Sequence, residues 1–205
     1  MSSKLKKKSK EKQKIEAYIG ITKAKTARFK QEKKEDDAIC MVSETLSSMT
    51  YLALLDVLGY KEKRLLKYQD KTLRLKEKWA NDIITTPEML FYCQKKNIKI
   101  KEWFDSIPKS QKLALSPLTI TTKEGAKIME LAVQTHGLFC AIILKEFFKA
   151  TLKEIHAVLD HIKNSIACCT IKQPTTRKPY LEAKDIDEIF KRELKLDLQT
   201  GEKVV

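Results

Sequence analysis

Apolar residues recur at three- and four-residue intervals on both sides of one glycine, and this pattern constrains the fold more than any other feature of the chain. One apolar stripe runs along residues 39–57, and a second runs from Leu65 to Trp79. Such spacing places the side chains on one face of an α-helix. Gly59 lies between the stripes and supplies the positive φ that often ends a helix. The sequence therefore predicts two helices joined by about three residues, which must lie antiparallel or cross at a steep angle.

The polar side of the second helix is rich in lysine, and two interpretations of the helix pair follow. The pair is either a structural hairpin or a DNA-binding helix-turn-helix whose second helix enters the major groove. Base edges are read largely by side chains that hydrogen-bond in the groove. The second helix contains little Asn, Gln or Ser, so the sequence favours the structural hairpin.

Composition favours an all-α protein. Of the 205 residues, 33% are charged and only five are glycine and five proline, which is typical of long helices with few turns. The alternation typical of strands is confined to short stretches such as Ile98–Ile100 and Leu196–Leu198. A chain of this length is long enough to bury a core in one or two small domains.

Changes in composition divide the chain into four segments. Residues 1–36 form a basic arm, expected to be partly disordered, and residues 37–107 form a first helical unit. Residues 108–122 contain two prolines and few charges, which predicts a linker. Residues 123–205 form a second helical unit.

Two short motifs mark helix starts. Thr85-Thr86-Pro87-Glu88 places a threonine cap, a proline and an acid where a helix begins. Thr151-Leu152-Lys153-Glu154 has the spacing of a capping box. Each motif precedes apolar residues at helical intervals, so the sequence predicts one helix with Pro87 at its first position and another that begins directly after Thr151.

The two helical units share one order of elements, which suggests an internal duplication. Each contains a long apolar helix, a tight joint, an amphipathic helix, a loop, a shorter helix and an apolar-x-apolar end. Leu58 corresponds to Phe147 or Phe148, and the end at Ile98–Ile100 corresponds to Leu196–Leu198. Two similar three-helix units are therefore expected to pack as a pseudo-symmetric pair.

The joint has the sequence Leu58-Gly59-Tyr60-Lys61-Glu62-Lys63-Arg64-Leu65, and it is followed by Tyr68, Asp70-Lys71, the Thr85–Glu88 helix start and Asn97-Ile98. These residues resemble short helical proteins encoded by phages and prophages of Gram-positive bacteria. The similarity covers about residues 40–100. Leu58, Lys61 and Glu62 depart from the usual run of aromatic-Gly-aromatic-Gly-Lys-Lys-Arg-Leu. The family has no established biochemical activity, so the resemblance implies a context and no mechanism.

The formal net charge of +14 favours anionic partners, namely nucleic acid, an acidic membrane face or an acidic protein. Half of it lies in residues 1–37, which contain 13 basic and 6 acidic residues. Only 5 of the 41 basic residues are arginine. Lysine is a hydrated point charge without the planar fork of arginine. The excess therefore favours loose attraction to a nucleic-acid backbone over sequence readout.

Two groups of basic residues form the predicted nucleic-acid contacts, with DNA and RNA both open as partners. Tyr18 or Phe29 would add a ring able to stack on a base, although the arm would equally serve as a solubilising tail. The predicted contacts in the arm are Lys4, Lys6, Lys7, Lys8, Lys10, Lys12 and Lys14, and those in the helix after Gly59 are Lys61, Lys63, Arg64, Lys67 and Lys71.

The alternative function is a protein-interaction or adaptor module that acts on a host or phage protein. Trp103 and Phe104 would then form the partner surface, because exposed aromatic residues often mark interaction sites. The opposite placement, with both rings folded back onto the core, is also open.

The motifs of enzymes and metal sites are missing from the sequence, so we expect no enzyme, no cofactor and no metal site. The five glycines are isolated and no phosphate-binding loop is present. His136 and Cys140 lie one turn apart, but no Cys-x-x-Cys accompanies them. The odd number of cysteines suggests reduced thiols and a cytoplasmic location. The most apolar run, Leu138–Leu144, is too short to cross a bilayer, so no membrane span is expected. The oligomeric state is open.

Overall fold

The regular structure of the described residues is helical. A computed structural model describes residues 41–115, 122–181, 185, 186, 188, 189 and 192, and their one β-bridge joins Lys172 to Pro179. The predicted all-α class is confirmed. The helices span residues 41–58, α2 (Glu62–Ala80), α3 (Thr86–Lys95), α4 (Ile100–Asp105), α5 (Lys109–Ala114), α6 (Lys123–Phe147) and α7 (Leu152–Thr170).

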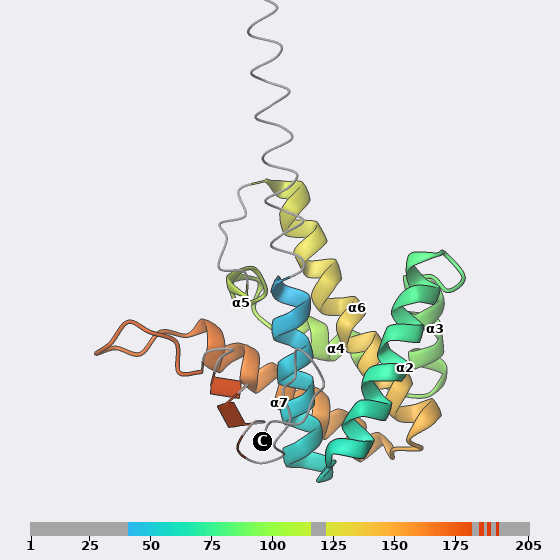
Figure 1. Cartoon of the computed structure of the whole chain (residues 1–205). Coiled ribbons are helices and arrows are strands. Elements are labelled where there is room, and N and C mark those ends of the chain that lie inside the picture. Colours follow the sequence, from blue (N-terminus) through green and yellow to red (C-terminus); the bar gives the residue numbers. More distant parts are fainter. Residues whose placement is uncertain (1–40, 116–121, 182–184, 187, 190–191, 193–205) are drawn as a thin grey trace, which may run out of the picture. The chain divides into compact units, whose positions relative to one another are not determined.

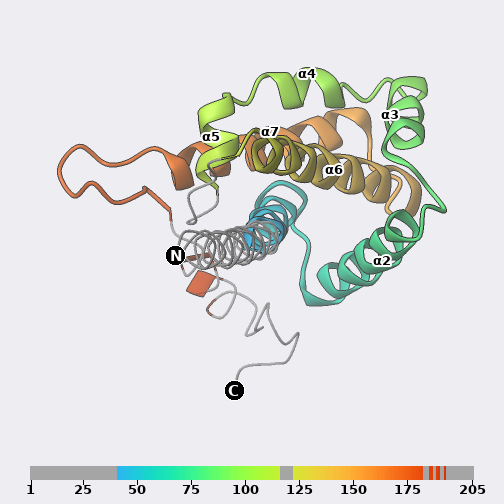
Figure 2. The same ribbon diagram turned by 90° about the horizontal axis from the view of Figure 1, so that it is seen from above.

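Helix α6 is the central helix of the compact unit that Ile39–Val205 form. It contacts all five of the helices α2, α3, α4, α5 and α7, as Figures 1 and 2 show. Every residue from Thr135 to Leu144 is buried. Helices from both predicted units thus pack against one helix and share one hydrophobic core. The predicted linker contains α5, which packs against α6 and α7.

The length and composition of α6 also meet the criteria for a membrane-crossing helix. Of its most apolar 18-residue window, 67% is buried inside the protein. The buried core helix of a soluble protein has the same composition. Leu138–Leu144, the run judged too short to cross a bilayer, lies within this longer helix.

Both motifs start helices as predicted, although α3 begins at Thr86, one residue before the predicted Pro87. Glu88 accepts a hydrogen bond from the Thr85 N–H at 2.7 Å, and Glu154 accepts one from the Thr151 N–H at 2.7 Å. Both pairs form capping boxes at the first residues of α3 and α7. Hydrogen bonds from the threonines hold the pKa values of both glutamates below their usual range.

The joint before α2 recurs 90 residues later, before α7. Gly59 has the predicted positive φ of 61°, and Lys149 has a φ of 55° at the corresponding position. Helices α2 and α7, which begin at residues 62 and 152, each contain 19 residues. The same backbone hydrogen bond closes each joint, from Tyr60 N–H to Leu54 O and from Ala150 N–H to Leu144 O, both at 3.0 Å.

The two joints give a pair of substitutions with opposite expected effects. A Cβ on Gly59 would have no atom within 4 Å, so Gly59→Ala should lower the free energy of unfolding by about 1 kcal/mol through backbone strain alone. Lys149→Gly removes the same strain, although glycine also gives the unfolded chain more conformational freedom. The net result should be a free energy of unfolding that is higher by roughly 0.5 kcal/mol. Urea unfolding of both variants tests this pair. A loss of stability in Lys149→Gly would contradict it.

Candidate nucleic-acid interface

Helix α2 is strongly basic, whereas α7, its counterpart after the second joint, is neutral. Seven basic and three acidic residues give α2 a formal charge of +4, while two of each sign give α7 a charge of zero. The buried residues of α2 are Leu65, Tyr68, Thr72 and Leu75. The geometry of the joint is therefore repeated, but the charge is confined to α2.

Three of the predicted contact residues form one edge of α2, each beside an aromatic ring. Arg64, Lys67 and Lys71 follow one another at three- and four-residue intervals and therefore lie along one side of the helix. We call these three residues the α2 basic edge. Each charge lies within the range of about 6 Å over which a cation is attracted to an aromatic ring. The distances to the ring centroids are 5.1 Å from Arg64 Cζ to Tyr60, 5.8 Å from Lys67 Nζ to Phe148 and 5.4 Å from Lys71 Nζ to Phe147.

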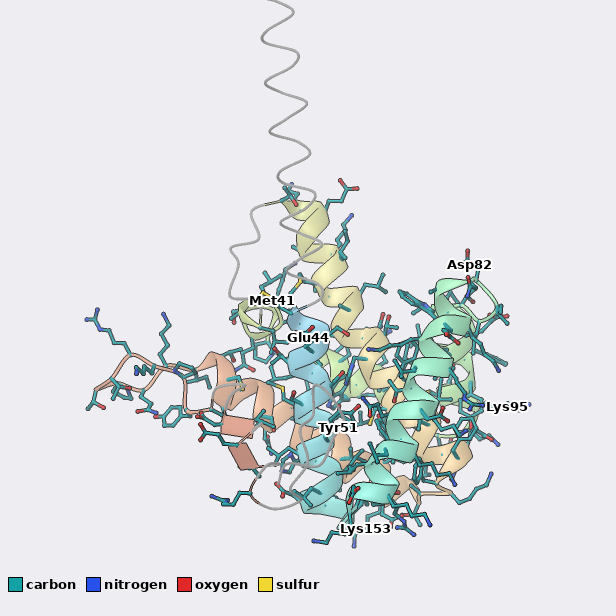
Figure 3. All side chains as sticks on the ribbon, in the orientation of Figure 1. Met41, Glu44, Tyr51, Asp82, Lys95 and Lys153 are labelled. Atoms are coloured by element: carbon teal, nitrogen blue, oxygen red, sulfur yellow. The ribbon has the colours of Figure 1, made fainter. Side chains whose placement is uncertain are left out.

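The rings under the α2 basic edge come from both joints. The centroids of Tyr60 and Phe148 are 5.3 Å apart, and Tyr68 lies 6.1 Å from Phe148. Lys153, near the start of α7, lies at the same end of the helical body as the beginning of α2 (Figure 3). Contacts between residues about 90 positions apart thus fix α2 and its charges against the end of α6.

Phe147 is the ring of this cluster most open to solvent, with 48% of its surface exposed. Proteins that bind single-stranded nucleic acids combine exposed aromatic rings with nearby cations. The bases stack on the rings, and the cations bind the phosphates. Phe147 is not among the contact residues predicted from the sequence. The periodic apolar pattern of α6 extends to its last turn, so the pattern alone gave no reason to expect this ring at the surface.

An acidic residue, Asp70, reduces the charge at one end of the edge. Asp70 lies 3.0 Å from the ammonium of Lys71 and 3.0 Å from Nε of Arg74. The hydrogen bond from Lys71 is the main reason that the pKa of Asp70 is lowered. Lys61 and Lys63 are exposed at the beginning of α2. The predicted contacts in the arm, Lys4 to Lys14, and the rings of Tyr18 and Phe29 lie outside the described residues.

Trp103 lies in the core and Phe104 is half-buried. The Trp103 ring is only 6% exposed and donates its Nε1–H to the Leu159 carbonyl at 2.6 Å. The ammonium of Lys112 lies 3.4 Å from the centroid of Phe104, and burial lowers the pKa of this lysine. Of the two placements open from the sequence, the structure gives Trp103 the core position. Lys112 lies in the predicted linker, where a buried lysine was not expected.

The histidines have separate partners. The Thr50 hydroxyl donates its proton to the Leu46 carbonyl. In the contact of 2.8 Å between Thr50 Oγ1 and His136 Nε2, the imidazole Nε2–H is therefore the donor and the hydroxyl oxygen is the acceptor. His156 accepts the Lys99 N–H at 3.2 Å, and His161 lies 3.1 Å from Asp56. Within the described ranges, no three His, Cys, Asp or Glu side chains are grouped as metal ligands.

Cys140 is buried one turn after His136 and lies beside the hydroxyl of Tyr68. Burial raises the pKa of the Cys140 thiol to about 12. A thiol with so high a pKa is protonated at neutral pH and is a poor nucleophile. Cys140 therefore acts as a packing residue between α6 and α2.

Comparison of the chain with protein-family models, curated proteins and solved structures finds no match. The resemblance to helical phage proteins thus stays a prediction.

Proposed function

We propose that this protein is a non-enzymatic accessory protein of phage or prophage type that associates weakly with nucleic acid. The observation that carries the proposal is the α2 basic edge, whose three cations lie over aromatic rings, one of which is the exposed ring of Phe147. The basic arm, through Lys4 to Lys14, would add further phosphate contacts.

The chemistry of the edge supports binding without sequence preference. Lysine and arginine side chains neutralise phosphates and release counterions, which gives affinity that falls steeply with added salt. Two of the three cations are lysines, which do not read base edges well. Phosphates are common to DNA and RNA, so the edge serves either of them.

The repeated joint supports an internal duplication as the origin of the fold. Two helix-joint-helix segments with the same spacing and the same backbone geometry at Gly59 and Lys149 are what a duplicated unit would leave. Only the first copy has a basic second helix. Under this proposal, the first unit binds nucleic acid and the second stabilises it by supplying α6.

A charge-matched pair of triple variants tests the proposed interface. Arg64→Gln/Lys67→Gln/Lys71→Gln should reduce the log–log salt slope of duplex binding by roughly 2 to 3 and the affinity at low salt by about ten-fold or more. The control is Lys95→Gln/Lys99→Gln/Lys101→Gln, which removes three exposed charges from the α3–α4 region. Fluorescence anisotropy across a salt series, with a generic duplex and a single strand, measures both quantities.

Measuring nucleic-acid binding of a chain that lacks residues 1–36 separates the contribution of the arm from that of the α2 basic edge. A flatter salt slope after truncation would assign part of the binding to the arm. Equal losses in both triple variants would contradict the proposed interface, because net charge alone would then explain binding. If the full chain does not bind at low salt, the proposed function is wrong.

A protein-interaction module is the second candidate function, and exposed apolar side chains on α2, on α3 and in the loop between them favour it. Leu73, Ile83 and Phe91 are each more than half exposed, which is the character of a partner surface. This surface differs from the predicted one, since Trp103 is in the core. A pull-down that captures one host or phage protein, with a yield that does not change as salt is added, would support this function.

A further inference from the structure

Residues 172–179 form a hairpin that projects from the helical body. Figures 1 and 2 show this segment, in orange, extending beyond the end of α7. Lys172 and Pro179 form a β-bridge at its base. The Gln173 N–H donates to the Lys178 carbonyl at 2.8 Å, and the Arg177 N–H donates to the Gln173 carbonyl at 3.0 Å. Backbone hydrogen bonds therefore define the shape of the hairpin.

Side chains reinforce this shape. The amide of Gln173 donates to the Pro179 carbonyl at 3.3 Å and accepts the Thr176 hydroxyl at 3.0 Å. The Thr176 oxygen in turn accepts the Lys178 N–H at 3.2 Å. The Tyr180 N–H, bonded to the Cys168 carbonyl at 2.9 Å, attaches the hairpin to the end of α7. A hairpin ordered in this way can present its charges in fixed positions.

The hairpin is basic. Lys172, Arg177 and Lys178 are exposed, and residues 171–181 contain no acidic residue. Arg177 is one of only five arginines in the chain and lies in the turn, where its φ is 55°. A guanidinium offers two parallel hydrogen bonds to a phosphate or to guanine. The rarest basic residue type of this protein is therefore placed where it can reach a ligand.

Polarity at the tip favours nucleic acid over a membrane. The turn carries Thr175, Thr176 and Arg177, whereas the exposed apolar residues Ile171 and Tyr180 lie at the base. A segment that enters a bilayer buries apolar side chains in the lipid. A narrow hairpin with a cation in its turn and two more beside it can instead approach the phosphates of a nucleic acid.

The hairpin lies on the side of the helical body opposite α2 in both views of the fold (Figures 1 and 2). We infer that the hairpin is a second nucleic-acid contact and that one protein bridges two nucleic-acid segments, with one on the α2 basic edge and one on the hairpin. This inference rests on the proposed function, because it requires that the α2 basic edge binds nucleic acid.

A bridging assay tests the inference with the full chain. An immobilised duplex is incubated with the protein and with a second, fluorescent duplex, and the retained fluorescence is measured. Lys172→Gln/Arg177→Gln/Lys178→Gln should retain binding to a single duplex within about three-fold but lose most of the bridging. The control is again Lys95→Gln/Lys99→Gln/Lys101→Gln, whose member Lys95 lies on the side of the body away from the hairpin (Figure 3). This control should bridge like the unmodified protein.

The outcomes separate the inference from the proposed function. The inference is overturned if the hairpin variant bridges as well as the unmodified protein does. It is also overturned if the unmodified protein binds one duplex but does not bridge two. In both cases the proposed function stands. A protein that binds no duplex at low salt overturns both. Hairpin-dependent binding to vesicles of phosphatidylserine and phosphatidylcholine without bridging would make a membrane the partner and would also overturn the inference. Circular dichroism of each variant confirms that the helices are intact.

Discussion

Gly137→Ala is expected to lower the free energy of unfolding by about 2 kcal/mol, although the same substitution within a helix normally raises it by up to about 1 kcal/mol. A Cβ at Gly137 would lie 2.4 Å from Cζ3 and 2.9 Å from Cη2 of Trp103. These distances are shorter than any normal contact between carbon atoms. The absence of a side chain at Gly137 is therefore what allows the indole to lie against α6.

The indole of Trp103 cannot move away without a cost. It is buried in the core, and its Nε1–H donates to the Leu159 carbonyl on α7. A displaced ring would strain the packing by about 1–3 kcal/mol and weaken a buried hydrogen bond worth roughly 1 kcal/mol. The gain in helix propensity offsets only part of this loss. Urea unfolding followed by tryptophan fluorescence measures the net effect.

A double-mutant cycle with Trp103→Phe identifies the clash as the cause. Phenylalanine lacks the outer ring of the indole, which contributes both close atoms. Gly137→Ala should therefore cost little, or even stabilise, when Trp103 is already replaced, with a coupling energy of about 2 kcal/mol. The same cost in both backgrounds would show that the clash with Trp103 is not responsible.

The stability of the protein should fall by about 2 kcal/mol between pH 7.5 and pH 5, because of His136. Burial in the core and, to a lesser extent, the charge of Lys76 on α2 lower the pKa of His136 from 6.5 to about 3. Between these two values the unfolded chain binds a proton that the folded protein does not bind. Protons therefore favour the unfolded state, and stability is fully present above pH 6.5 and decreases as the pH falls.

His136→Gln tests the origin of this pH dependence. Glutamine can still donate a hydrogen bond to Thr50 but does not take up a proton in this range. The variant should have a lower stability at pH 7.5 and a much flatter pH dependence down to pH 5. Glu88 and Glu154, with lowered pKa values, lose their contributions only at more acidic pH. A pH profile in His136→Gln that is parallel to that of the unmodified protein would contradict the assignment.

Local chemistry made several elements predictable from the sequence. Each helix cap, at Thr85 and at Thr151, forms between residues only three positions apart. The left-handed backbone conformation at Gly59 is likewise a local property of the chain. The all-α class follows from the 3.6-residue period, which reflects the geometry of the helix itself. The basic character of α2 is likewise a property of consecutive residues. These features follow from the sequence because their physical causes are short-range.

Features that join distant residues depended on the tertiary structure. The chain has two helix-joint-helix segments, but only their packing makes α6 the central helix of one shared core. Packing against α6 and α7 likewise accounts for α5, a helix within the segment predicted as a linker. The contact of Trp103 with Gly137 and the alignment of the α2 basic edge with Phe147 join residues that are far apart in the chain. Apolar periodicity identifies which face of a helix is buried, but many partners would bury that face equally well. Which partner it meets is decided by the fit of particular side chains in three dimensions.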